Sequence, residues 1–236
     1  MTLKEALDDL KIAFTNFEKA ARSDDKTVLQ NALALSESQE GFAFNDENPG
    51  IIVFADINRF KSINTAYGYA AGDAAISQVG ILIEELFVQK CEARAFRASG
   101  DEFVILLQSR FLKKLKSAAK SFSSCSVHFE ENKFSLGVSF GFAFGDEDFD
   151  FETIKRRAEI ACKKAKSKGD GICLEWAEEM ERTSLESLRN TCLKCGTINA
   201  CEVPSNLKLN NLKACAICGT SFESKYRRSS HSKGDL

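Results

Sequence analysis

The sequence has little proline, no long apolar run and almost no net charge. Only two prolines occur among 236 residues, which excludes a proline-rich linker protein. The 32 basic and 34 acidic residues give a formal net charge of −2, which excludes both a uniformly basic nucleic-acid coat and an acidic tail protein. The longest nearly uncharged stretch, residues 134–145, is shorter than the roughly 20 residues that a membrane helix needs. Acids near the N-terminus argue against a signal peptide, so we expect a cytoplasmic protein with no membrane contact.

Cysteine, in contrast, is abundant, with nine residues. An odd count without a signal peptide is atypical of a disulfide-rich secreted scaffold. In a reducing compartment, thiols are buried, catalytic or metal-bound more often than paired. Five of the nine fall in the last quarter of the chain: Cys192, Cys195, Cys201, Cys215 and Cys218.

Four of these cysteines have the spacing of a structural zinc site. Cys192 and Cys195 form one C-x2-C pair, Cys215 and Cys218 form another, and a glycine follows each pair. Such turns aim two thiolates at one tetrahedral ion, and a full four-sulfur shell leaves no open position for catalysis. We therefore predict a zinc ribbon that binds structural Zn²⁺, with a redox or disulfide pair as the alternative. The basic residues 225–228 could bind nucleic acid or form a solvated tail, so the ribbon could serve a protein or nucleic-acid partner.

The remaining chain divides by its pattern into an N-terminal helical part and a larger α/β part. Apolar residues recur at helical spacing from Leu3 to Phe17, and a second helix is expected through Leu35, after a break at residues 23–25. This pair could pack on the main domain or form a dimerising stalk. The predicted organisation is residues 1–40 for the N-terminal helices, 41–176 for the main domain, 177–190 for a helical linker, and 191–236 for the zinc ribbon and basic tail.

Alternating strands and helices fill the main domain. Strands are predicted over 50–55, 126–130, 134–144 and 171–176, and a hairpin over 96–107 that turns at residues 99–101. Helices are predicted over 74–88, 111–122 and 151–166. The order indicates an α+β fold with a central, mainly antiparallel sheet wrapped by helices.

Three carboxylates lie where strands of this sheet begin or end. Asp56 ends the first strand, and Asp101 and Glu102 occupy the hairpin turn. If the strands are neighbours, these acids converge and repel one another unless a cation lies among them. Hard carboxylate oxygens suit Mg²⁺, which favours phosphoryl transfer, and Gly100 would let a phosphate approach the backbone. Acidic turn residues are, however, often simply solvated.

Two sequence runs around these acids resemble the signatures of the GGDEF family, the diguanylate cyclases. FADINRFKSINTAYGYAAGD (residues 54–73) resembles the first signature, and RASGDEF (residues 97–103) resembles the second, which gives the family its name. FSLGVSFG (134–141) is similar to a later strand, and AEIACKKAKSKG (158–169) to the last helix. The resemblance covers residues 48–176.

The resemblance implies a palm-like nucleotide-cyclase fold. It also implies that a homodimer condenses two GTP molecules into cyclic di-GMP and releases pyrophosphate. Asp56, the carbonyl of Ile57, Asp101 and Glu102 would hold Mg²⁺. Asp101 would also be the base, and Lys61 would stabilise charge in the transition state. Asn64 and Asp73 would bind guanine, and the triphosphate would be surrounded by Phe60, Lys61, Gly100 and Lys166.

Several positions depart from the family pattern. Ser99 replaces a glycine, Asn58 an aspartate and Tyr69 a histidine. Asp170 stands where the family usually has a phosphate-binding arginine, which reverses a charge beside the expected triphosphate. Residues 90–93 lack the RxxD motif, so product inhibition there is not expected. The leucine-threonine-glycine-leucine segment of many members is also missing, and the N-terminal helices would replace its support.

These departures leave two alternatives to an active cyclase. One is a catalytically weak GTP sensor or interaction protein, which Asp170 and Tyr69 favour. The other is a related cyclase or polymerase that uses other nucleotides, which Asp73 argues against because its carboxylate suits guanine.

Overall fold

The computed structural model describes residues 2–39, 49–145, 150–180, 188–191 and 198–201. The chain forms two compact units, Met1–Trp176 and Ala177–Leu236. No helix within the described ranges is both long enough and apolar enough to cross a membrane.

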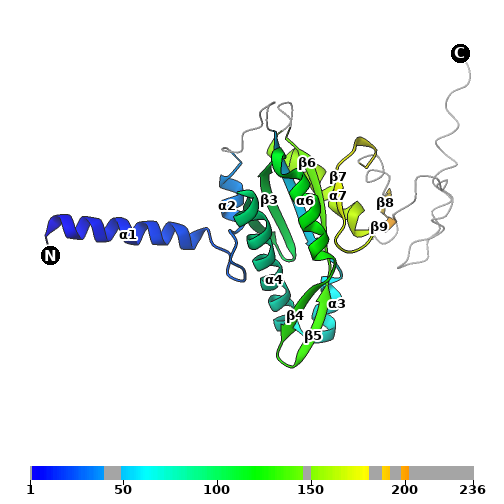
Figure 1. Cartoon of the computed structure of the whole chain (residues 1–236), viewed down its shortest axis with the longest axis horizontal. Helices are drawn as coiled ribbons and strands as arrows, with labels where there is room; N and C mark the ends of the chain where they lie inside the picture. Colours follow the sequence, from blue (N-terminus) through cyan, green and yellow to red (C-terminus); the bar gives the residue numbers. More distant parts are fainter. Residues whose placement is uncertain (1, 40–48, 146–149, 181–187, 192–197, 202–236) are drawn as a thin grey trace, which may run out of the picture. The chain divides into compact units, whose positions relative to one another are not determined.

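The first unit is built on a five-stranded sheet with the order β2-β3-β1-β6-β7 (Figure 1). The β1–β3, β1–β6 and β2–β3 pairs are antiparallel, and β6–β7 is parallel, so the predicted mainly antiparallel sheet is confirmed. The strands of this unit, with the separate β4–β5 hairpin, are β1 (Gly50–Ile57), β2 (Arg94–Ser99), β3 (Glu102–Gln108), β4 (Cys125–Phe129), β5 (Asn132–Leu136), β6 (Val138–Phe144) and β7 (Cys173–Glu175).

Helices cover both faces of this sheet. The helices are α1 (Leu3–Ala21), α2 (Ala32–Glu37), α3 (Phe60–Tyr67), α4 (Tyr69–Ile83), α5 (Gln89–Cys91), α6 (Leu112–Lys120) and α7 (Phe151–Lys166). A π-helical stretch, η1 (Glu84–Val88), joins α4 to α5, and two 3₁₀ turns, η2 (Ser109–Phe111) and η3 (Ser121–Ser123), flank α6.

Alternate residues of the central strand enter two separate cores. Ile51, Val53 and Ala55 of β1 pack into the larger core, to which α4, α6 and the β4–β5 hairpin contribute. Ile52 and Phe54 pack on the other side, against α2 and α7. A strand with apolar residues on both faces must be buried on both, which explains the continuous apolar run of β1.

The predicted strand over residues 134–144 is wrong as a single element. The chain forms β5 and β6, which belong to different sheets and are separated by Gly137. The carbonyl of Gly137 accepts a hydrogen bond from the Asn58 backbone N–H at 2.8 Å, so the chain changes partner at this point. Apolar composition alone could not reveal that change.

The segment between α1 and α2 pairs with the sheet. The Gln30 backbone N–H donates to the Ala95 carbonyl at 3.2 Å, and the Arg97 N–H donates to the Gln30 carbonyl at 2.8 Å. Gln30 therefore covers part of the outer edge of β2. The second helix begins only at Ala32, where the Asn31 side chain accepts from the Ala34 N–H, so its expected start after residues 23–25 is wrong.

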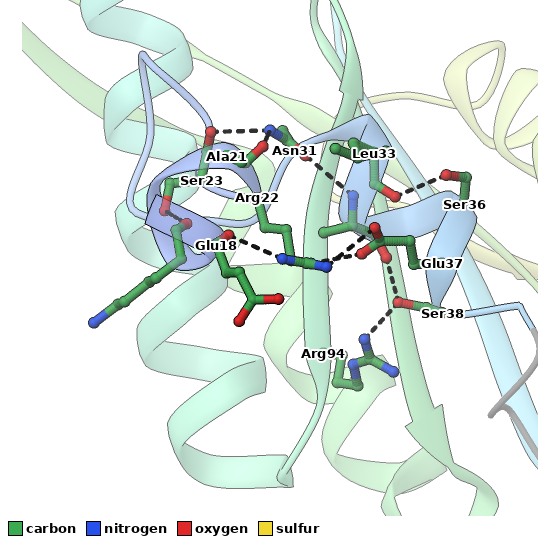
Figure 2. A network of polar contacts seen from close by, with 12 residues as sticks. Glu18, Ala21, Arg22, Ser23, Asn31, Leu33, Ser36, Glu37, Ser38 and Arg94 are labelled. Atoms are coloured by element: carbon green, nitrogen blue, oxygen red, sulfur yellow. Dashed lines mark hydrogen bonds and ion pairs between the residues drawn. The ribbon is translucent and has the colours of Figure 1, made fainter. Parts of the chain in front are cut away.

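Polar contacts fix the end of α1 to α2 (Figure 2). Arg22 Nε donates to Glu37 Oε2 at 2.6 Å. Asn31 Nδ2 donates to the carbonyls of Ala21 at 2.8 Å and Ser23 at 3.1 Å. Side-chain hydrogen bonds thus join the end of α1 to α2 and to the residue that precedes α2.

Within the second unit, β8 (Leu188–Thr191) and β9 (Ile198–Cys201) form an antiparallel pair. A strand at 188–191 differs from the helix predicted as far as residue 190. The proposed zinc ligands Cys192, Cys195, Cys215 and Cys218 lie outside the described residues.

Candidate active site

The acids predicted to converge come from two neighbouring antiparallel strands. Asp56, in β1, stands directly opposite Glu102, the first residue of β3. The backbone N–H of Ile57 donates to the carbonyl of Asp101 at 3.3 Å, which places the β2–β3 turn beside the end of β1. The structure therefore brings all three acidic residues to one end of the sheet.

A lysine ammonium lies between two of the expected metal-binding oxygens. Lys166 Nζ, at the end of α7, donates to Asp56 Oδ1 at 2.5 Å and to the Ile57 carbonyl at 3.4 Å. The residues predicted to bind Mg²⁺ are therefore in contact with a lysine ammonium in this structure.

Asp101 ionises less readily than an ordinary aspartate. Burial raises the pKa of its carboxyl group, the nearby Asp56 carboxylate raises it further, and Lys166 and a backbone hydrogen bond only partly oppose this. Glu102 adds a smaller repulsion. A half-buried carboxyl beside like charges is a natural proton acceptor for chemistry near neutral pH.

The turn that holds Asp101 is shaped by Gly100 and held by side chains on both sides. Gly100 has a φ of +43°, a left-handed conformation that favours glycine, and a Cβ at this position would have no atom within 4 Å. Arg97 Nε donates to the Gly100 carbonyl at 2.9 Å, and Ser99 Oγ donates to Glu102 Oε2 at 2.8 Å. The space above Gly100 leaves its backbone open to solvent.

The donor set at this edge fits Mg²⁺ bound together with substrate. In the described part of the chain, no three acidic, histidine or cysteine side chains are grouped closely enough to hold a metal alone. Mg²⁺ commonly takes only one or two carboxylates and completes its shell with water and substrate phosphates. The Asp56 carboxylate and the Ile57 carbonyl, already sharing one cation, satisfy that requirement.

The predicted guanine-binding residues also lie together. Asn64 of α3 packs against Gly72 of α4: a Cβ added to Gly72 would lie only 1.9 Å from Asn64 Oδ1. That oxygen is buried and has no hydrogen-bond partner among the described residues. Asp73 follows Gly72 directly, and Lys26 Nζ donates to its Oδ1 at 2.6 Å.

Phe60 and Lys61 begin α3, which follows the end of β1 after a two-residue turn. Phe60 packs against the larger core, and Lys61 is exposed. Arg59, which precedes them, has the left-handed φ of 57° that turns the chain from strand into helix.

Asp170 is held by the same turn that carries these residues. Its Oδ1 accepts from Asn58 Nδ2, and its Oδ2 accepts from an Arg59 guanidinium nitrogen, each at 2.6 Å. Asn58 is itself buried, and its Oδ1 accepts from Ser139 Oγ at 2.9 Å. The unexpected carboxylate of Asp170 is therefore matched by a cation and an amide.

A family model decides the relationship of the chain. The model described as diguanylate cyclase, GGDEF domain, matches residues 21–171, more than half of the chain. The chain belongs to the GGDEF domain family. The matched residues begin ahead of β1 and include the segment that pairs with β2.

Individual relatives agree with this membership. The chain is 28% identical over 162 residues to the probable diguanylate cyclase DgcI of Escherichia coli, covering 68% of this chain and 34% of DgcI. It is 26% identical over 141 residues to the diguanylate cyclase DgcS of Shewanella oneidensis, covering 60% and 45%. It is also 30% identical over 158 residues to the cyclic di-GMP phosphodiesterase PdeB of the same organism, covering 64% and 18%. The chain thus spans less than half the length of these curated relatives.

Solved structures show the GGDEF fold directly. The coiled coil and GGDEF domain of DgcB from Caulobacter crescentus, solved with c-di-GMP, matches with a TM-score of 0.59 at 21% identity, covering 73% of this chain and 94% of that one. The FimX GGDEF domain from Pseudomonas aeruginosa matches with a TM-score of 0.59 at 19% identity, covering 65% and 98%. The palm-like α+β fold is therefore confirmed.

The sequence did not identify two cations in this GGDEF site. Lys26 reaches Asp73 across 47 residues, and Arg59 reaches Asp170 across 111. No periodicity links positions so distant. The nearest available signal was the charge reversal at Asp170, which invites a search for a compensating basic residue.

Proposed function

We propose that this chain is a Mg²⁺-dependent diguanylate cyclase that condenses two GTP molecules into cyclic di-GMP across a homodimer. The observation that carries the proposal is the convergence of Asp56, Asp101 and Glu102 at one strand end. The pair formed by Asn64 and Asp73, a hydrogen-bonding amide and carboxylate, supports it. A decayed site would have no need of either set.

Each half-reaction forms one P–O bond and breaks another. The 3′-oxygen of one GTP attacks the α-phosphorus of the other, the bond from that phosphorus to the β-phosphate oxygen breaks, and pyrophosphate leaves. Asp101 accepts the proton of the attacking hydroxyl, which its raised pKa favours. In the second half-reaction, the 3′-oxygen of the other GTP attacks the α-phosphorus of the first, which closes the ring and releases the second pyrophosphate.

The negative charge of the phosphates would be neutralised by the bound metal ion and by lysines of α3 and α7. When bound, Mg²⁺ would supply Lewis acidity at the phosphate oxygens, held by the Asp56 carboxylate and the Ile57 carbonyl, with Asp101 and Glu102 beside them as the further predicted ligands. Lys61 stabilises the charge that develops in the transition state, and Lys166 moves from Asp56 toward the triphosphate. Phe60, the first residue of α3, packs against the larger core and so supports the helix start that carries Lys61. Gly100 allows a phosphate close to the backbone.

The homodimer supplies the second GTP, and α1 is the element we propose for its contact. None of the residues of α1 is buried, yet it carries an apolar stripe. The exposed apolar side chains of that stripe are Leu3, Leu7, Leu10, Phe14 and Phe17. A second copy of the helix would cover this stripe and present the two active sites to each other.

The charge reversal at Asp170 favours the second candidate, a GTP-binding protein with weak turnover. Its contacts oppose that interpretation, because Arg59 and Asn58 both bind the carboxylate. The negative charge is compensated within the protein before any phosphate arrives. The use of other nucleotides is disfavoured by the carboxylate of Asp73, which suits the N–H donors of guanine.

We further propose that the tail is a zinc ribbon, with Cys192, Cys195, Cys215 and Cys218 as ligands of structural Zn²⁺. The antiparallel pairing of β8 with β9 supports it, because Cys192 and Cys195 fall in the connection between these two strands. Four thiolates on one ion require a reducing compartment, in agreement with the expected cytoplasm. The ribbon would offer a surface to a protein or nucleic-acid partner.

Metal analysis tests the ribbon. Purified full-length protein should contain one zinc per chain, and the double variant Cys215→Ser/Cys218→Ser should lose it. Cys201→Ser is the matched control, because Cys201 lies outside both pairs. Full zinc content in the double variant would contradict this ligand set.

A product assay tests the cyclase. Purified protein incubated with GTP and Mg²⁺ should yield cyclic di-GMP and pyrophosphate, identified by mass spectrometry. Bound but unchanged GTP would favour the weak sensor, and a different cyclic product would favour the third alternative.

A further inference from the structure

Lys26 lies beside the carboxylate proposed to bind guanine. Its ammonium donates to Asp73 Oδ1 at 2.6 Å, although the two residues come from different elements. Both side chains are partly exposed, at 36% and 48%, so a ligand could reach the pair. This places a donor of three hydrogen bonds next to an acceptor of several.

The backbone that carries Lys26 is firmly held. Asp24 Oδ1 accepts from the Lys26 N–H at 3.1 Å and from Thr27 Oγ1 at 2.9 Å. Asp24 in turn forms an ion pair with Arg97 at 3.1 Å, with only 9% and 12% of the two side chains exposed. The position of Lys26 is therefore set by a nearly buried ion pair that connects it to β2.

Asn64, the other residue predicted to bind guanine, belongs to α3, the helix before the one that carries Asp73. The Asn64 side chain lies against Gly72, next to Asp73, and its buried oxygen has no partner in the described part of the chain. The Asn64 amide thus contacts the residue before Asp73, and the Lys26 ammonium contacts Asp73 itself.

This combination is complementary to one purine edge. Guanine presents an O6 acceptor beside its N1–H and N2–H donors. Adenine presents an amino donor and a ring acceptor at the corresponding places, which an ammonium and a carboxylate would each oppose.

We infer that Lys26 is a specificity-determining residue that donates to O6 of guanine while it remains bound to Asp73. The inference rests on the proposed function, since it assumes that Asp73 binds the base. Asp73 can accept the guanine N–H groups without releasing Lys26, because each carboxylate oxygen has more than one acceptor site. The ammonium then has donors left for O6.

Nucleotide binding to the full-length protein tests this inference. The probes are 3′-deoxy-GTP, which lacks the attacking hydroxyl and cannot react, and its 6-thio analogue, whose sulfur is a poorer acceptor than O6. Dissociation constants are measured by calorimetry for the wild type, Lys26→Met and Lys26→Arg. Lys19→Met is the matched control, since Lys19 is an exposed lysine at the end of α1.

In Lys26→Met, the affinity for 3′-deoxy-GTP should fall about tenfold, near the lower end of what one hydrogen bond to a charged group contributes. The affinity for the 6-thio analogue should change little, so the preference of the wild type for oxygen at position 6 disappears. Lys26→Arg should retain most of the preference, and Lys19→Met all of it.

Three results would overturn the inference. Tighter binding of 3′-deoxy-GTP by Lys26→Met would show that Lys26 blocks Asp73. Equal losses for both probes in Lys26→Met, at an unchanged melting temperature of that variant, would show that Lys26 supports the site without donating to O6. If the wild type binds neither probe, the proposed function itself fails.

Discussion

Two groups of acidic residues near the end of β1 differ in the partners that balance their charge. At the ends of β1 and β3, Asp56, Asp101 and Glu102 meet a single lysine. Burial, and then the nearby Asp56 carboxylate, raise the pKa of Asp101. Asp170, in contrast, is held by Arg59 and Asn58. The first group sets three carboxylates against one ammonium, whereas the single carboxylate of the second is matched by one guanidinium and one amide. A carboxylate is thus informative about metal binding only when its own partners are known.

Among the substitutions in these two groups, the removal of Asp101 should lower the rate of cyclic di-GMP formation most. Asp101→Ala should lower the rate of cyclic di-GMP formation by at least about 1,000-fold, because it removes the proposed base and a metal ligand together. Mass spectrometry of the product measures the rate, and circular dichroism checks the fold. Glu131→Ala, which removes an exposed acid of the β4–β5 turn, is the control. Activity within tenfold of the wild type in Asp101→Ala would exclude Asp101 as the base.

Removing Arg59 should expose the charge of Asp170. Arg59→Ala should raise the KM for GTP roughly three- to tenfold and affect kcat less, because an unmatched carboxylate then repels the triphosphate. In the double variant Arg59→Ala/Asp170→Asn, the KM for GTP should return most of the way to the wild-type value. Arg110→Ala breaks the exposed ion pair with Glu92 and serves as the control. If the double variant is no better than Arg59→Ala, compensation of Asp170 is not the role of Arg59.

The smallest effect concerns stability. The folded-state pKa of Asp101 lies above the ordinary aspartate value of 3.8, so ionisation opposes folding. The penalty is absent while the carboxyl is protonated in both states and develops as pH rises through the folded-state pKa. Asp101→Asn should therefore raise the melting temperature at pH 7. The rise should be at most about 4 °C, because solvent screens a half-exposed carboxyl.

This stability gain should shrink as pH falls toward 3.8, when followed by thermal unfolding at a series of pH values. Glu131→Gln provides the matched control, as an exposed acid outside the cluster. A gain that is the same at every pH would assign the effect to packing instead of charge.

Much of the fold followed from local patterns in the sequence. The apolar run of β1, the hairpin at Gly100 and the helix ending at Lys166 were predicted because their signals lie within single elements. The division of residues 134–144 was not predicted, because both strands are apolar and only their partners differ.

In the candidate site, too, features that depend on local patterns were predicted and features that depend on distant packing were not. Convergence of the acids followed from placing one hairpin beside one strand. The contacts of Lys26 and Arg59 did not, because they depend on how distant segments pack, and exposed basic residues give no apolar pattern.

The pairing of Gln30 with β2 has a consequence for behaviour in concentrated solution. An open strand edge offers unpaired N–H and C=O groups to any neighbouring chain and invites aggregation. Here the Ala95 carbonyl and the Arg97 N–H are already bonded to Gln30. The segment before β1 therefore also protects this part of the edge from pairing with another chain. Truncations that begin after Gln30 would be expected to lose solubility even where the active site is left whole.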